Sequence, residues 1–353
     1  MIKFHLPQVI ASSIFFALFH VQMTSQNYQT NHFDNQWSFN RVTQSECLNN
    51  PYHTIVLGRE EHDVNDPKCE AFELDNAGQL VNSREYVSSS GSVVEFLHIE
   101  PAFNGYIACG FTNNGVTTVP VVAVLSPSLD VFESRVYPGV YFDDQNNSYT
   151  AHGVAMHITT DGQQGFVVSG IVGDGDLLQT GATGKRHALA MRLKPDLSVD
   201  WVRAFNGGIP WASEDMDAFN HGTEILDGTK FFFSGSFNGS DSPQEAAAVM
   251  LDGAGNLTWG YRYSNQTGGA HSSLSGDVVL NASTGEIHQL VNNSITHTWG
   301  VTTWDLLGNI DLARTWNSQY ADLNWQGLSL LRDPVDPNIL TVGGFQRSHG
   351  WDG

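Results

Sequence analysis

Familiar catalytic motifs and positive charge are both scarce in this 353-residue sequence. It contains no Gly-x-Ser-x-Gly elbow, phosphate-binding P-loop, His-Glu-x-x-His or Cys-x-x-Cys motif, so no strong motif indicates a chemistry. Lys and Arg total 16 against 37 Asp and Glu, a formal net charge of −21. This acidic balance argues against nucleic acid and anionic membrane surfaces as partners. Charged residues make up only 15%, whereas aromatic residues reach 11% and glycines number 35, which is typical of a turn-rich β protein rather than of disorder.

Long apolar runs are also lacking, except at the N-terminus. Lys3 precedes an apolar stretch that ends near Phe19, and the polar, small-residue segment 23–26 follows. A positive start, a short apolar core and a small-residue exit predict a signal peptide over residues 1–25. The alternative is a retained membrane anchor, which the short and interrupted run disfavours. We therefore expect a secreted or cell-surface protein whose mature chain, residues 26–353, has no membrane span.

Cysteine is rare too, with three residues in the whole chain. In an oxidising compartment Cys47 and Cys69 are a candidate disulfide within the first repeat, although spacing alone does not fix the pairing. Cys109 occupies a repeat position that is otherwise filled by Ser169 and Ser234. We interpret it as a small buried residue rather than a nucleophile.

What the sequence does contain is an internal repeat. Five segments combine a short apolar strand, a tight turn and a strand rich in aromatic or charged residues; their apolar strands end at Leu74, Leu125, Leu193, Leu251 and Trp304. In the turns, Asp can bond the backbone that follows it, and Gly supplies the positive φ of the hairpin corner. The turns therefore predict hairpins at regular intervals along an all-β chain.

Two further elements precede each hairpin and complete a four-stranded unit. One is a continuous apolar strand ending in a small residue and Gly, such as Phe231 to Gly235, and another strand comes before it. Four strands in the order inner, second, third, outer form one blade of a β-propeller. The predicted blades cover residues 43–86, 91–137, 151–205, 219–263, 272–316 and 325–353.

The sixth blade is incomplete, because the chain stops after its second strand. Residues 36–41 resemble an outer strand, and we expect them to close the ring by completing this blade. One strand is still missing, so either the last blade has three strands or the chain is a fragment of a longer protein.

The Leu-Asp-x-x-Gly-Asn-x-x-Trp turn, together with the Gly-Phe-Val-Val-Ser-Gly type of strand, resembles repeats of secreted bacterial β-propeller proteins. The resemblance spans residues 43–345. It implies a large surface or exported protein, often one with a C-terminal sorting domain, which is not seen in this sequence. The repeat is a scaffold motif and implies no chemistry of its own.

Histidines provide the first candidate site. His152-Gly153 and His221-Gly222 stand at the start of predicted innermost strands, as do Ser275-Gly276 and Gln326-Gly327. In a propeller such positions surround one mouth of the central channel, where His152 and His221 could hold a metal or orient a small anion. The alternative is a set of polar residues that solvate the channel.

Acidic residues provide two more candidates. Asp174 and Asp176 resemble the start of a calcium loop, although Lys185 stands where the twelfth residue, a Glu, belongs, which favours a surface turn. Ca²⁺ is thus the one cofactor that the sequence suggests. The loop that contains Trp211, Glu214, Asp215 and Asp217 places carboxylates beside an aromatic ring, as sugar-binding clefts do. The alternative, which we favour, is that an acidic, aromatic-rich surface produces such a group of residues by chance.

Three functions are compatible with these observations. The first is a secreted binding or adhesion scaffold for an extracellular protein or carbohydrate. The second is a carbohydrate-active enzyme, a hydrolase or lyase, with its site at the channel mouth. The third is a structural spacer within a larger exported protein. We expect the scaffold, because no catalytic motif is present.

Overall fold

The computed structural model describes residues 37–47, 50–60, 69–88, 92–113, 117–138, 140–142, 148–150, 152–173, 186–205, 217–226, 228–237, 245–263, 273–281, 284–293, 298–317, 323–332 and 339–348. These residues form strands and turns and contain no helix. They therefore include no helix that could span a bilayer. The predicted signal peptide lies outside the described residues.

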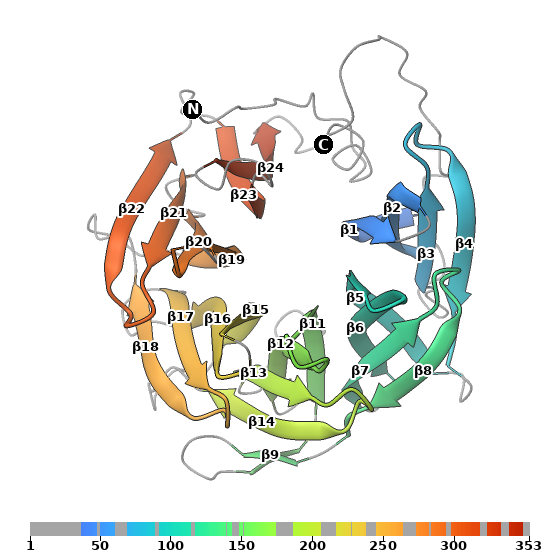
Figure 1. Cartoon of the computed structure of the whole chain (residues 1–353), viewed down its shortest axis with the longest axis horizontal. Helices are drawn as coiled ribbons and strands as arrows, with labels where there is room; N and C mark the ends of the chain where they lie inside the picture. Colours follow the sequence, from blue (N-terminus) through green and yellow to red (C-terminus); the bar gives the residue numbers. More distant parts are fainter. Residues whose placement is uncertain are drawn as a thin grey trace. The chain divides into compact units, whose positions relative to one another are not determined.

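The strands follow one another as antiparallel meanders, which Figure 1 labels in chain order. Five sheets have four strands each: β1–β4, β5–β8, β11–β14, β15–β18 and β19–β22. The pairs β9–β10 and β23–β24 form two-stranded sheets. The predicted all-β class, with four-stranded sheets and an incomplete last sheet, is thereby confirmed for the described residues.

The strands of the first two sheets and of the following pair have these bounds: β1 Trp37–Cys47, β2 Asn50–Glu60, β3 Cys69–Leu74, β4 Leu80–Tyr86, β5 Val93–Ala102, β6 Gly105–Asn113, β7 Thr118–Leu125, β8 Val131–Val136, β9 Val140–Phe142 and β10 Ser148–Thr150. The later strands are β11 His152–Thr160, β12 Phe166–Gly173, β13 Arg186–Leu193, β14 Val199–Phe205, β15 Ala218–Leu226, β16 Lys230–Phe237, β17 Glu245–Asp252, β18 Leu257–Tyr263, β19 Ser273–Asn281, β20 Glu286–Asn293, β21 Thr298–Trp304, β22 Ile310–Asn317, β23 Leu323–Arg332 and β24 Leu340–Ser348.

The chain divides into two compact units. Among the described residues, the first unit contains β1–β8 and β11 as far as Ile158. The second contains β9, β10 and the chain from Thr159 onwards.

Burial falls from the second strand of a sheet to the fourth. In β6, Tyr106 to Cys109 are fully buried, and in β16 Phe231 to Phe233 are as well. In β8 every residue is exposed. The continuous apolar pattern of the second strands thus reflects burial on both faces, as the sequence predicts.

The predicted turn chemistry is present in the hairpins between third and fourth strands. Asp305 Oδ1 accepts the N–H groups of Leu307 and Asn309, both at 2.8 Å. Gly308 follows with a φ of 87°. Asp252 and Gly255 repeat the arrangement, with a φ of 77° at the glycine. Asp therefore fixes the turn, and Gly supplies the left-handed corner.

Aromatic side chains at the fourth strands connect neighbouring sheets. In the second unit, Trp201 Nε1 donates to Gly253 O at 3.1 Å, and Trp259 Nε1 donates to Leu306 O at 3.2 Å. In the first unit, the Tyr86 hydroxyl donates to Leu129 O at 3.0 Å. Each acceptor lies in the hairpin turn of the next sheet. Aromatic residues of the fourth strands thus join sheets by hydrogen bonds as well as by packing.

The predicted closing strand is wrong. Residues 37–41 do not complete the last sheet but begin β1, in which Trp37 pairs with Glu60 and Arg41 pairs with Leu57. Cys47 pairs with Asn50, so β1 and β2 follow each other almost directly along the chain. A strand that can pair with its immediate successor closes the smallest loop, which costs the least conformational entropy.

Candidate functional site

The first strands of the sheets contain an irregularity at corresponding positions. The pairing of β5 with β6 shifts between Phe96 and His98, and that of β15 with β16 shifts between Phe219 and His221. In β19 the shift lies between Ser275 and Val278, on either side of Asp277. Such bulges turn side chains out of the regular alternation and are frequent beside active sites.

The glycine that ends the second-strand motif makes room for the bulge. A Cβ at Gly110 would lie 1.8 Å from Glu95 O, and a Cβ at Gly235 would lie 2.0 Å from Ala218 O. No side chain fits there without moving the first strand. The sequence motif of a small residue followed by Gly therefore fixes the backbone from which His98 and His221 project.

His221 forms a dyad with Asp277 from the next sheet, both in the second unit. His221 Nδ1 lies 2.8 Å from Asp277 Oδ1, and each side chain is 11% exposed. The carboxylate is itself held by two backbone donors: Val278 N–H lies 2.9 Å from Oδ1, and Leu330 N–H lies 3.1 Å from Oδ2. Three first strands, β15, β19 and β23, thus converge on one carboxylate.

This arrangement determines where the proton of His221 sits. An ionised carboxylate only accepts hydrogen bonds, so Nδ1 of His221 is the donor in the dyad. The lone pair of the neutral imidazole is then on Nε2. A His whose Nδ1–H is held by Asp, with Nε2 as the basic nitrogen, is suited to take a proton from a bound water. The sequence predicted His221 as a candidate but not Asp277 as its partner.

His152, the other predicted histidine, has a different role. It begins β11 in the first unit and is partly exposed. Its Nδ1 accepts the N–H of Thr118 at 3.3 Å, which places the proton of the neutral ring on Nε2. The counterpart of His221 in the first unit is instead His98: His98 pairs with Cys109 just after the bulge of β5, as His221 pairs with Ser234.

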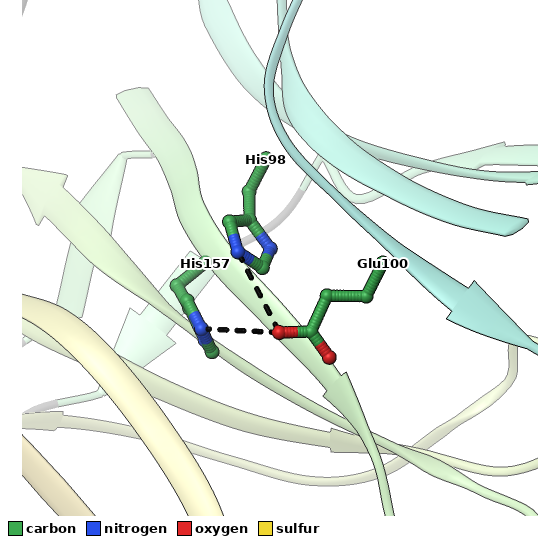
Figure 2. A group of neighbouring side chains, drawn as sticks. All are labelled: His98, Glu100 and His157. Atoms are coloured by element: carbon green, nitrogen blue, oxygen red, sulfur yellow. Dashed lines mark ion pairs between the residues drawn. The ribbon is translucent and has the colours of Figure 1, made fainter. Parts of the chain in front are cut away.

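A cluster of His98, Glu100 and His157 lies in the first unit (Figure 2). His98 and Glu100 alternate on β5, so both project from the same face of the strand, and His157 comes from β11. Glu100 Oε1 lies 3.7 Å from Nε2 of His98 and 3.7 Å from Nε2 of His157. The imidazole rings are 4.0 Å apart between centroids and tilted by 34°.

The cluster is open on the Glu100 side. The side chains of His98 and His157 are 2% and 3% exposed, whereas that of Glu100 is 29% exposed. Nδ1 of His98 accepts the Ile158 N–H at 3.3 Å. Two nitrogen donors and one carboxylate can share a proton or hold a metal ion. The cluster is not apparent from the sequence, because its members are brought together by strand alternation and by the packing of distant repeats.

Several predicted residues do not contribute to a described site. Asp217 is 1% exposed, directly before β15, which removes it from any surface cleft. The remaining acidic and aromatic candidates lie outside the described residues: Trp211, Glu214, Asp215, Asp174 and Asp176. The calcium loop and the sugar-binding loop therefore stay predictions.

The predicted Cys47–Cys69 disulfide is wrong. Cys69 is a buried thiol, and its Sγ accepts the Phe96 N–H at 3.3 Å. Cys47 pairs with Asn50 at one end of β2, whereas Cys69 pairs with Arg59 near the other end. Nine residues of extended strand span about 30 Å, far beyond the reach of a disulfide. Cys109 is a fully buried thiol that donates to Ala155 O at 3.6 Å.

A groove of about 640 Å³ in the first unit lies against β4 to β8. Valine, serine and threonine form most of its lining, and Glu85 and Tyr86 are the ionisable residues in it. Burial raises the pKa of Tyr86 far above its usual value. None of His98, Glu100 and His157 lines this groove, so it is not part of the candidate site.

No family model matches the chain, and no curated protein matches it. The resemblance to secreted bacterial propeller repeats therefore stays a prediction. Among solved structures, an α-L-arabinofuranosidase of Fusarium graminearum, Arb93A, shares 12% identity over 90% of each chain, with a TM-score of 0.53. The periplasmic gluconolactonase PpgL of Pseudomonas aeruginosa shares 9% identity over 82% of this chain and 75% of its own, with a TM-score of 0.49. Both neighbours are enzymes. The fold that this chain shares with the arabinofuranosidase is the β-propeller.

Proposed function

We propose that this protein is a carbohydrate-active hydrolase in which His221, oriented by Asp277, is the general base that activates water. The observation that carries the proposal is the hydrogen bond of 2.8 Å between His221 Nδ1 and Asp277 Oδ1, with Asp277 fixed by two backbone N–H groups. The two solved neighbours named above, an arabinofuranosidase and a gluconolactonase, favour a carbohydrate-derived substrate over other hydrolase substrates.

The dyad suits a cyclic sugar ester, that is, a sugar lactone. Nε2 of His221 removes a proton from water while the water oxygen attacks the lactone carbonyl carbon. When the ring C–O bond breaks, the same imidazole returns the proton to the departing oxygen, and a sugar acid is released. Water is the only co-reactant, and one histidine serves both steps.

A glycosidic bond fits the dyad less well. Most glycosidases place two carboxyl groups on opposite sides of the scissile bond, one of them as an acid and one as a base or nucleophile. In the dyad the single carboxylate, Asp277, is already engaged by His221, Val278 and Leu330. We therefore assign lactones rather than glycosides as the substrate class.

The test is hydrolysis of a panel of aldonolactones and aryl glycosides by the full-length protein, followed by proton release and by chromophore release. We expect activity on lactones and a loss of about 10²–10⁴-fold in kcat for His221→Gln. His288→Gln is the matched control, because His288 lies in the same unit but bonds Thr303 Oγ1 within its own sheet. Absence of lactone hydrolysis, or equal activity of His221→Gln and the wild type, would contradict the proposal.

A binding scaffold remains the alternative prediction. It is favoured by the lack of catalytic motifs in the sequence, whereas the dyad offers it no support. If the panel is inactive and a glycan array reports binding, the scaffold replaces the hydrolase.

A further inference from the structure

We infer that His98, Glu100 and His157 form a binding site for a divalent transition-metal ion, with Zn²⁺ as the best match. This site belongs to the first unit and is separate from the His221–Asp277 dyad of the second. The inference does not depend on the proposed hydrolase activity.

The separations in the cluster fit a shared ion better than direct hydrogen bonds. Glu100 Oε1 is 3.7 Å from both Nε2 atoms, which exceeds the usual N–H···O range of about 2.7–3.2 Å. Two donors that bind one zinc ion at about 2.1 Å with tetrahedral angles lie about 3.4 Å apart. All three ligand atoms lie within 4.8 Å of one another. A contraction of a few tenths of an ångström at Glu100 Oε1 therefore brings its two pairs to coordination distance.

The donor set selects the class of metal. Two imidazole nitrogens and one carboxylate oxygen suit zinc and neighbouring transition metals, whereas calcium takes oxygen ligands almost exclusively. This site thus differs in chemistry from the calcium loop that the sequence suggested at Asp174 and Asp176. Three protein ligands leave a fourth position for water, and the exposed side of Glu100 is where solvent can reach it.

The backbone holds the ligands on paired strands rather than on loops. His98 and Glu100 pair with Cys109 and Ile107 of β6, and the bulge before His98 is held by the close approach of Gly110 to Glu95 O. Ligands on such strands keep their separation without the metal, which lowers the conformational cost of binding.

One hydrogen bond of His98 must break when a metal binds, and its loss is a measurable sign of coordination. The Ile158 N–H donates to Nδ1 of His98 at 3.3 Å, so Nε2 carries the proton of the neutral ring. Binding of a metal at Nε2 moves this proton to Nδ1 and breaks the bond to Ile158. One long hydrogen bond is weaker than the coordination bond that replaces it, so we expect metal to bind and the Ile158 amide to exchange faster in the metal-bound protein.

The test is calorimetric titration of the full-length, chelator-treated protein with Zn²⁺, supported by the visible absorption of bound Co²⁺. We expect one tight site per chain that Glu100→Gln and His157→Gln each weaken by about 100-fold or more. Glu100→Gln is the main variant, because a partly exposed, isosteric change should leave the fold intact; circular dichroism checks this.

Two matched controls make the result specific. His53 and Glu73 form another His–carboxylate pair in the first unit, with Nδ1 and Oε1 2.5 Å apart, so His53→Gln should leave the affinity unchanged. His221→Gln should also bind zinc as the wild type does, whether or not it hydrolyses lactones. A wild type without tight zinc binding, or Glu100→Gln with wild-type affinity, would overturn the inference.

Discussion

Gly235 of β16 lies against the backbone of Ala218 in β15, so closely that a Cβ at Gly235 would stand 2.0 Å from Ala218 O. The contact sits beside the bulge that precedes His221. A glycine in the buried strand β16 thereby sets the position of a candidate catalytic histidine in the neighbouring strand β15.

Replacement of this glycine by a larger residue should therefore lower the stability of the fold. We expect Gly235→Ala to lower the free energy of unfolding by at least about 2 kcal/mol, because a backbone carbonyl must move. Chemical denaturation measures the loss. Gly260→Ala is the control: a Cβ there meets its nearest neighbour, Leu257 Cδ1, at 3.5 Å, so its stability should be close to that of the wild type. Equal stability of the two variants would contradict this role of Gly235.

The aromatic connection between sheets predicts a smaller effect. Trp259 stacks on Trp304 with centroids 5.7 Å apart and donates Nε1–H to Leu306 O. Trp259→Phe keeps an aromatic ring but removes the donor, so we expect a loss of about 1 kcal/mol in the free energy of unfolding. Trp259→Ala should lose about 3–5 kcal/mol, because it also removes the stacked ring. Chemical denaturation of both variants and the wild type measures these losses, and we expect the slope of the free energy of unfolding against denaturant concentration to be unchanged.

The turn aspartates predict a dependence of stability on pH. Hydrogen bonds from Asn309 and from backbone N–H groups lower the pKa of Asp305. A carboxyl group with a lowered pKa in the folded state stabilises the fold above its unfolded value of about 3.9. This contribution disappears as the pH falls through the folded value.

The variant that isolates this effect is Asp305→Asn. It should unfold at a lower temperature than the wild type at pH 7, and the difference should shrink steadily as the pH falls below about 4. Thermal melting over this pH series is the measurement. A difference that does not change with pH would mean that the charge of Asp305 has no part in the turn.

Much of this architecture could be predicted from sequence because it depends on local chemistry. Asp252 and Asp305 each bond backbone groups within the next four residues, so the turn is encoded locally. The apolar run at Phe231 likewise indicates a buried strand without reference to distant residues. The motif of a small residue followed by Gly235 correctly predicted the strand. The reason why a glycine is needed there is the bulge in the paired strand β15, which the sequence does not reveal.

The site was less predictable because its residues come from different repeats. His98 and His221 are equivalent only through their pairing with Cys109 and Ser234, which depends on strand register. The position of each histidine relative to the following glycine in the sequence predicted instead that His152 is the equivalent of His221. The wrong disulfide between Cys47 and Cys69 has the same origin: proximity in sequence does not reveal the length of β2 between them.

Asp277 should matter for catalysis through His221 rather than by touching the substrate. In Asp277→Asn the side-chain amide can be oriented to donate to Nδ1, which would put the proton of His221 on Nε2 and remove the base. We expect kcat for lactone hydrolysis to fall by about 10²-fold or more, with KM nearly unchanged. A change confined to KM would indicate that Asp277 positions the substrate instead.

The nitrogen resonances of the His221 side chain test the central claim most directly. With ¹⁵N-labelled histidine, and His221→Gln to assign the signal, NMR shows which ring nitrogen carries the proton. The hydrogen bond of 2.8 Å to Asp277 predicts a protonated Nδ1 and a lone pair on Nε2 in the neutral ring. A proton on Nε2, with a bare Nδ1, would contradict both the dyad and the general base derived from it.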